Sequence, residues 1–329
     1  MAPEYGATTG YFPIDGETLA YLRQTGRTEA HIARVAAYAE RAGIALDPEA
    51  SPRYTRVIEI ALDRVQMHVA GPRRPQDLHP YGQTRAVLAA LDFTPAPGAD
   101  SGLPRHPIAI AAITSCTNTS DPRLLMAAGL LARKARQAGL RVPSWVKTSL
   151  GPGSPAAADY LARAGLLDDL AAVGFDIVGY GCTTCIGNAG PLPGAVQDAM
   201  AAGAIHPVAV LSGNRNFTGR IHPDLDLGFL MSPPLVIAFA LAGDAERDLS
   251  QEPVQTAADG RAVYLGDLWP DSAEIDAALA QGLRPGDFQA AFKIASANPA
   301  WQALQSSDTP RFPWDPASCL LYTSPSPRD

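Results

Sequence analysis

The chain has 329 residues, of which 47% are hydrophobic and 18% are charged, and its formal net charge is −7. These values are typical of a soluble globular protein with one large core or two ordinary ones, and they exclude a disordered chain. The sequence has no basic block, which disfavours a broad nucleic-acid surface. Its longest apolar stretch, residues 235–242, is too short to cross a bilayer.

The first residues lack the basic and apolar regions of a secretory signal. The chain has four cysteines, and two of them form a Cys-x-x-Cys pair. Such a pair without an export signal indicates a reducing compartment, where this spacing points to metal or redox chemistry. We therefore expect a cytoplasmic protein.

The first third of the chain combines helical and strand-like patterns. Two helical patterns lie between residues 17 and 43, separated by Gly26 and ended by Gly43. Residues 56–62 and 65–69 alternate like strands, and one short helix is expected over residues 85–91. We interpret residues 1–80 as the C-terminal part of an upstream α/β domain and residues 81–105 as a linker.

Residues 106–245 alternate between strand and helix patterns. Strands are expected at four places, residues 108–113, 145–150, 175–180 and 208–211. Asp121 can N-cap a helix over residues 123–137 with Pro122 at its first position, a second helix ends near Gly165, and a third, apolar all round, covers residues 235–242. This alternation predicts an α/β fold with three α/β/α layers and a mostly parallel sheet.

Cysteine and polar motifs follow three of these strands. Cys116 follows the first strand, Cys182 follows the third, and an Asn-Arg-Asn sequence at residues 214–216 follows the fourth. Ligands of such folds bind at the carboxyl ends of the strands, which lie along one edge of the sheet. We therefore expect the three motifs to meet at one rim.

The Cys-x-x-Cys pair is formed by Cys182 and Cys185, between Gly181 and Gly187. Its spacing lets two thiolates reach one metal, but a redox dithiol and a structural zinc site are alternatives. Zinc would need four ligands, and no histidine lies near either cysteine motif. Three thiolates, with Cys116 as the third, and one open position suit an iron–sulphur cluster.

Arg215 and Arg220 are the candidate cations for a carboxylate substrate. Guanidinium groups bind carboxylates through two parallel hydrogen bonds, and Gly213 and Gly219 permit a close approach of this loop. The alternative is a surface loop with ordinary solvated arginines.

Taken together, the motifs resemble those of the aconitase family. The similarity is dense in three places, residues 113–120 (ITSCTNTS), 180–188 (YGCTTCIGN) and 212–217 (SGNRNF) followed by Gly219 and Arg220. Milder matches extend it in both directions, at residues 4–8, 71–77, 145–148 and 232–234. The resemblance covers residues 1 to 316.

The resemblance implies a [4Fe–4S] cluster held by Cys116, Cys182 and Cys185. The family's fourth iron acts as a Lewis acid that takes the hydroxyl and a carboxylate of the substrate. Arg215 and Arg220 match the family's substrate-carboxylate arginines, and Asn214 matches a residue beside the cluster. Glu4 matches a family acid close to the labile iron, with a strand-end or cap residue as the alternative.

The activity implied is a lyase reaction of the tricarboxylic acid cycle, in which citrate and isocitrate interconvert through cis-aconitate. The alternatives are a dehydratase of 2-methylcitrate or 2-methylisocitrate, a cluster-free relative that binds RNA, and an inactive fragment. The expected partner is a small tricarboxylate, with no membrane and no nucleic acid, and the full-length protein is expected to be a monomer.

The family's four-domain enzymes are much longer than this chain. The resemblance implies that the first domain, with a histidine and an aspartate, and the mobile last domain, with the serine that serves as base, are missing. Residues 246–316 are then a linker towards that last domain. Residues 317–329 resemble nothing in the family, so we interpret them as a non-native tail and give Cys319 no role.

Overall fold

A computed structural model describes residues 6–115, 121–311 and 313–315. The chain forms two compact units, residues 1–289 and residues 290–329. The first unit carries all the strands and most of the helices of the described residues. The second contains the end of α12 (Gly286–Ser296) and the short helix α13 (Pro299–Gln302).

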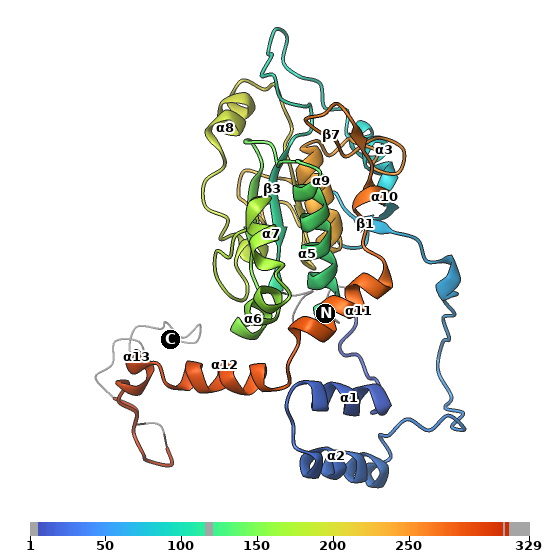
Figure 1. The fold of residues 1–329 in the computed structure, drawn as a ribbon, viewed down its shortest axis with the longest axis vertical. Helices are drawn as coiled ribbons and strands as arrows, with labels where there is room; N and C mark the ends of the chain where they lie inside the picture. Colours follow the sequence, from blue (N-terminus) through green and yellow to red (C-terminus); the bar gives the residue numbers. More distant parts are fainter. Residues whose placement is uncertain (1–5, 116–120, 312, 316–329) are drawn as a thin grey trace, which may run out of the picture. The chain divides into compact units, whose positions relative to one another are not determined.

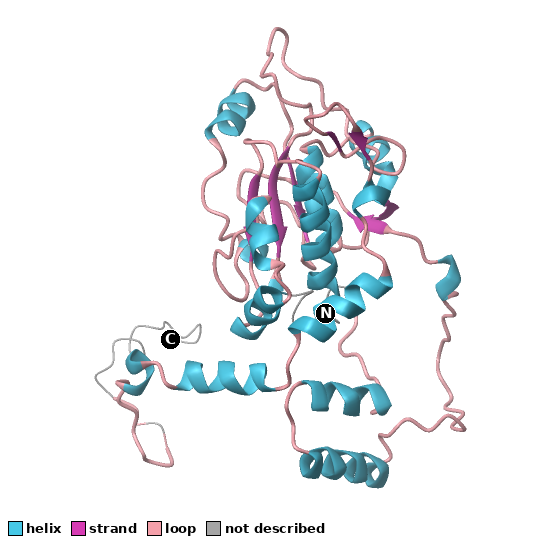
Figure 2. Ribbon diagram, in the orientation of Figure 1, coloured by secondary structure: helices cyan, strands magenta, loops and turns pink. Residues whose placement is uncertain are grey.

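A six-stranded sheet with the order β2-β1-β6-β5-β3-β4 forms the centre of the first unit (Figures 1 and 2). Its strands are β1 (His68–Ala70), β2 (Leu78–Pro80), β3 (Ile108–Ile113), β4 (Lys147–Leu150), β5 (Val208–Leu211) and β6 (Leu227–Leu230). The last four run parallel to one another, whereas β1 is antiparallel to both β2 and β6. The predicted α/β class with a mostly parallel sheet is therefore confirmed.

Besides α12, the described residues of the first unit form ten α-helices, and two short strands form a separate hairpin. The helices are α1 (Gly16–Gln24), α2 (Glu29–Ala42), α3 (Thr84–Ala89), α5 (Pro122–Gln137), α6 (Pro155–Arg163), α7 (Leu167–Ala172), α8 (Gly194–Ala201), α9 (Pro233–Ala242), α10 (Leu265–Leu268) and α11 (Ser272–Gly282). The hairpin pairs β7 (Gln255–Thr256) with β8 (Ala262–Val263). Helices α9, α10 and α11 all pack against α5, and α9 also packs on β3 and β5.

The start of α5 follows the capping rule read from the sequence. The Asp121 carboxylate accepts a hydrogen bond from the backbone N–H of Arg123 at 2.9 Å, and Pro122 occupies the first helical position. Because the first N–H groups of a helix have no partner within it, this cap fixes where α5 begins. The chain leaves the helix through Gly139, which has a left-handed φ of 73°.

Both faces of the sheet are buried. All six residues of β3 are buried; Ile108, Ala111 and Ile113 join the larger core cluster, whereas Ala109 and Ile110 join the smaller one. The larger cluster includes residues of α5 and α9, which lie over the same face in Figure 1, and the smaller one includes residues of α8. Burial on both faces explains why β3 reads as a continuous apolar run.

Two expected strands are wrong. Residues 56–62 form no strand, and Val57, Ile58, Ile60, Leu62 and Val65 are 60–82% exposed. Residues 175–180 contribute only an isolated parallel bridge between Ile177 and Leu150. Strand β4 begins two residues later than expected, β1 overlaps only the end of the 65–69 pattern, and β6 was not expected at all. No helix among the described residues is long and apolar enough to cross a membrane.

Candidate functional site

The paired cysteines lie on a loop that follows the bridge at Ile177. Cys182 is exposed, Cys185 is 3% exposed, and both are free thiols. Cys185 belongs to a short 3-10 helix, Thr184–Ile186, that ends at Gly187 with a left-handed φ of 91°. The loop therefore presents one thiol to solvent and holds the other against the protein.

The cysteine loop packs onto the loop that follows β4. The backbone N–H of Gly181 donates to the carbonyl of Pro152 at 2.9 Å. A Cβ atom on Gly151 would lie 2.9 Å from Oγ1 of Thr183 and 3.7 Å from the carbonyl oxygen of Ile113, the last residue of β3. Glycine at position 151 thus lets the cysteine loop approach the carboxyl end of β3.

The loop of residues 212–220, here called the arginine loop, is tied to that same end of β3. Thr114 donates its backbone N–H to Oγ of Ser212 and its hydroxyl to the Ser212 carbonyl, both at 2.9 Å. Further along, Nδ2 of Asn216 donates to the carbonyls of Gly228 at 2.6 Å and Ala70 at 3.2 Å. Because these groups are buried, the bonds fix the arginine loop to β3, β6 and β1.

The arginine loop also contacts the cysteine loop directly. Nε of Arg220 donates to the carbonyl of Cys185 at 3.2 Å. A Cβ atom on Gly213 would lie only 3.1 Å from Sγ of Cys185. Asn214 and Arg215 follow Gly213 and are partly buried. The structure therefore brings together the loops that carry five of the predicted site residues, Cys182, Cys185, Asn214, Arg215 and Arg220.

Glu4, Cys116 and Cys319 lie outside the described residues. Cys116 comes directly after Ser115, which is described and buried. Within residues 6–115, 121–311 and 313–315, no three or more histidine, cysteine, aspartate or glutamate side chains are grouped so that they could hold a metal ion. The described part of the site supplies two thiols, those of Cys182 and Cys185.

Sequence reasoning missed the residues that hold the loops together. The two hydrogen bonds that Thr114 donates to Ser212, and the hydrogen bond between the hydroxyls of Ser149 and Thr184 at 3.2 Å, are buried at the rim. Thr114, Thr184 and Ser212 lie within the three quoted motifs and Ser149 lies near the end of β4, and these positions are the only signal that the sequence carries for them. Hydroxyl side chains often bond local backbone in this way, so that signal is weak.

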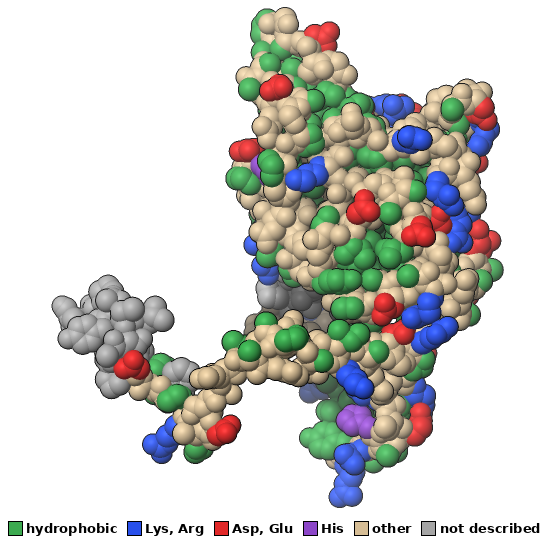
Figure 3. Space-filling model, turned by 60° about the vertical axis from the view of Figure 1, so that its left-hand side comes forward, with side chains coloured by type: hydrophobic (Ala, Val, Ile, Leu, Met, Phe, Trp, Pro, Cys, Tyr) green, Lys and Arg blue, Asp and Glu red, His purple; other side chains and the backbone are tan. Residues whose placement is uncertain are grey.

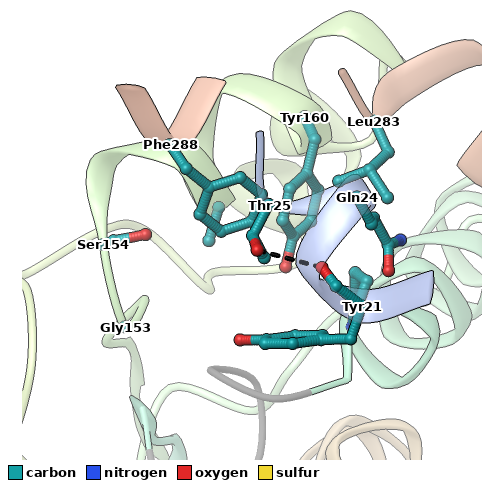
Figure 4. A pocket seen from close by; sticks show the side chains of 10 residues that line it. Tyr21, Gln24, Thr25, Gly153, Ser154, Tyr160, Leu283 and Phe288 are labelled. Carbon is teal, nitrogen blue, oxygen red and sulfur yellow. Dashed lines mark hydrogen bonds between the residues drawn. The ribbon is translucent and has the colours of Figure 1, made fainter. Parts of the chain in front are cut away.

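A small pocket lies beside α1, α6 and the start of α12, and it contains no predicted site residue (Figure 4). Tyr21 and Thr25 line it from the end of α1, Ser154 and Tyr160 from the α6 region, and Phe288 from α12. The Tyr160 hydroxyl is buried and has no hydrogen-bond partner among the described residues. Burial, and next the nearby Asp121 carboxylate, raise the pKa of this hydroxyl.

Acidic and basic side chains are interspersed on the face shown in Figure 3. Partly exposed ion pairs of the protein include Arg85 with Glu252 at 2.7 Å and Arg123 with Asp276 at 2.5 Å. Ion pairs of this exposed kind cancel local charge and contribute little to stability.

The fold and the rim define an α/β protein whose paired-cysteine loop is packed against an arginine loop. A sequence profile of the Aconitase family (aconitate hydratase) matches residues 1–243, and the chain belongs to this family of enzymes. It is 47% identical over 342 residues to phosphinomethylmalate isomerase of Streptomyces viridochromogenes, covering 99% of this chain and 38% of that protein.

Two further relatives are named aconitate hydratase A. The protein of Bacillus subtilis is 42% identical over 348 residues, which cover 99% of this chain and 38% of the relative. The protein of Thermus thermophilus is 43% identical over 348 residues, covering 99% of this chain and 39% of the relative. The chain thus spans less than half the length of these curated relatives.

Proposed function

We propose that this chain is the cluster-bearing part of a hydro-lyase that interconverts citrate and isocitrate through cis-aconitate. The observation that supports this most strongly is the direct contact between the arginine loop and Cys185, at the carboxyl edge of the parallel sheet. The guanidinium groups of the arginine loop can bind an anion, and the neighbouring thiols are soft ligands for a metal. Family membership supports the same reaction class.

The residues of the rim fit a [4Fe–4S] cluster. Cys182 and Cys185 are free thiols separated by two residues in the chain, and the glycine at position 213 keeps a side chain away from the sulphur of Cys185. Thiolate sulphur is the preferred ligand of such clusters. We propose Cys116, Cys182 and Cys185 as the ligands. When bound by three thiolates, the cluster supplies an iron with an open position that acts as a Lewis acid.

The chain's own residues would bind and orient the substrate. Nε of Arg220 donates a hydrogen bond to the Cys185 carbonyl. The two terminal nitrogens of the Arg220 guanidinium are therefore the atoms proposed to bind a substrate carboxylate. Arg215, on the same loop, is proposed to bind a second carboxylate, and Asn214 to orient the substrate beside the cysteines. Glu4 is proposed to hold or release a proton near the reacting hydroxyl.

A related substrate is the second candidate. Identity to phosphinomethylmalate isomerase is 47%, against 42% and 43% for two aconitate hydratases A. A phosphinate in place of one carboxylate is also an anion that arginine binds through paired hydrogen bonds. Titration calorimetry of the reconstituted chain with citrate, 2-methylcitrate and phosphinomethylmalate separates these choices by the order of their affinities.

Iron and acid-labile sulphide analysis after anaerobic reconstitution tests the cluster. We expect about four irons and about four sulphides per wild-type chain, since that is the stoichiometry of this cluster type. Cys182→Ser should lose most of both, whereas Cys319→Ser should keep the wild-type content. Equal iron in wild type and Cys182→Ser would contradict the proposed ligands.

Activity and RNA binding give separate results. We expect the 329-residue chain, once reconstituted, to hydrate cis-aconitate little or not at all, because it spans only 38% of the length of the relatives that it matches. Turnover comparable to that of a full-length relative would contradict this. A salt-dependent shift of hairpin RNA by the cluster-free chain would favour the RNA-binding alternative instead.

A further inference from the structure

We propose that Gly213 is a positioning residue that holds the thiol of Cys185 in place before any cluster is bound. Its missing side chain lets the arginine loop close directly onto the sulphur. The contact is a property of the described structure, whereas its role in cluster binding rests on the proposed function.

The contact is too tight for a methyl group unless its neighbours shift by a few tenths of an ångström. An ideal Cβ on Gly213 would lie 3.1 Å from Sγ of Cys185 and 3.0 Å from Cδ1 of Leu211. Both neighbours are buried, with Cys185 at 3% and Leu211 at 0% exposure, so neither can move into solvent without disturbing the core. The φ of Gly213 is outside the left-handed region, so the requirement for glycine is steric rather than conformational.

The arginine loop cannot retreat from the sulphur, because it is attached on both sides of Gly213. On one side Ser212 is paired with Thr114 through two hydrogen bonds of 2.9 Å. On the other side Arg220 donates to the carbonyl of Cys185 itself at 3.2 Å. A methyl group at position 213 would therefore displace the Cys185 thiol rather than the loop.

The same attachment explains the glycine that ends the cysteine loop. Gly187 has a left-handed φ of 91°, and a Cβ there would lie 3.3 Å from the carbonyl oxygen of Arg220. The two loops thus approach each other where Gly213 meets Cys185 and where Gly187 meets Arg220, and Arg220 also donates to the Cys185 carbonyl. This arrangement gives the two thiols different environments, with Cys182 exposed and Cys185 enclosed.

Residue-resolved alkylation tests the proposal on the metal-free full chain. The chain is treated with iodoacetamide, and labelling of each cysteine is followed by peptide mass spectrometry. In wild type we expect Cys182 to react much faster than Cys185, because accessibility limits the reaction of a buried thiol. Gly213→Ala should raise the Cys185 rate by at least about fivefold and leave the Cys182 rate within about twofold of wild type.

Gly194→Ala is the matched control, since nothing lies within 4 Å of a Cβ at position 194. It should leave both labelling rates at their wild-type values. A folded Gly213→Ala chain in which Cys185 reacts as slowly as in wild type would overturn the proposal. If Gly213→Ala does not fold, Arg220→Lys serves instead, because it removes the Nε donor to the Cys185 carbonyl; an unchanged Cys185 rate in that variant would overturn the proposal equally.

Iron retention separates this proposal from the proposed function. After reconstitution, Gly213→Ala should lose iron to a chelator at least about fivefold faster than wild type. If wild type takes up no iron and sulphide, the cluster function fails while the labelling difference stands. A different result is that wild type binds the cluster, while Gly213→Ala matches wild type both in the labelling rate of Cys185 and in the rate of iron loss. In that case only the positioning role fails.

Discussion

Nδ1 of His106 lies 2.6 Å from Oε1 of Glu246, and the imidazole is 1% exposed. Because a carboxylate only accepts hydrogen bonds, neutral His106 carries its proton on Nδ1. Its Nε2 is then a buried acceptor that has no hydrogen-bond partner among the described residues. A second such pair, His206 with Asp226 at 2.6 Å, places its ring centroid 5.8 Å from that of His106.

This arrangement makes the fold sensitive to acid. Burial lowers the pKa of His106 below its ordinary 6.5, and the hydrogen bond to Glu246 offsets this only in part; Arg105 and His206 also oppose the imidazolium. Burial would raise the pKa of Glu246, but hydrogen bonds from Arg105 and His106 outweigh it and lower that pKa. Both side chains therefore bind protons more readily in the unfolded chain than in the folded protein. Their contribution to the free energy of unfolding is present in full above their ordinary pKa values and is lost as the pH falls.

We accordingly expect the urea midpoint of unfolding to fall as the pH is lowered from about 7 to about 5, mainly through His106. His106→Gln should flatten this dependence, although it lowers stability at neutral pH. His31→Gln, at an exposed position on α2, should leave the slope unchanged. The same slope in both variants would show that the sensitivity lies elsewhere.

Tyr160→Phe should leave the protein as stable as wild type or make it more stable by up to about 1 kcal/mol. The hydroxyl of Tyr160 has no partner among the described residues, so removing it relieves the cost of an unsatisfied buried group. Urea unfolding measures the difference. A loss of more than about 1 kcal/mol would indicate that the hydroxyl is bonded in solution, for example to a water in the pocket of Figure 4.

Gly129→Ala should destabilise the protein although alanine favours helices. A Cβ at this position of α5 would lie 2.7 Å from Cβ of Leu166, which is fully buried. Overpacking of a core costs about 1–3 kcal/mol, which exceeds the gain of about 1 kcal/mol from helix propensity. Gly194→Ala, at the start of α8 in open space, should be neutral or slightly stabilising in the same unfolding assay.

The exposed apolar residues between 56 and 65 should promote self-association. We expect the double variant Ile58→Lys with Ile60→Lys to aggregate less and to bind less of the dye anilinonaphthalene sulphonate. Because both side chains are about 70% exposed, its unfolding free energy should change by less than about 0.5 kcal/mol. Ile110→Lys, at a residue 1% exposed in β3, is the contrasting control and should unfold the chain. A large loss of stability in the double variant would mean that the segment is packed in solution.

Local signals in the sequence were sufficient to predict the positions of elements that have a capping residue or are fully buried. Helix α5 has its Asp121 cap and α9 its uninterrupted apolar run, and both lie close to where they were expected. Strand β6 has only four residues, and one of them is Gly228, so its propensity is low. Its place depends on tertiary contact, since it is defined by pairing with β5 and with β1.

Alternation alone misled the prediction for residues 56–62. Alternation gives a segment the propensity for a strand, but a strand forms only where a neighbouring strand bonds it, and the described residues offer none there. The site shows the same limit. Parallel topology is enough to predict that loops after strands share a rim, whereas the contact of Gly213 with Cys185 depends on loop conformations that no spacing rule encodes.

Helix α9 is buried from Pro233 to Leu241, and it packs against α5, β3 and β5. Water can reach its amide groups only when these neighbours separate. In hydrogen–deuterium exchange its peptides should therefore be among the last to take up deuterium, at a rate set by opening of the whole α/β core. The exchange rate of α9 thus measures global unfolding, and the exchange rates of the rim loops can be compared with it to detect their local opening.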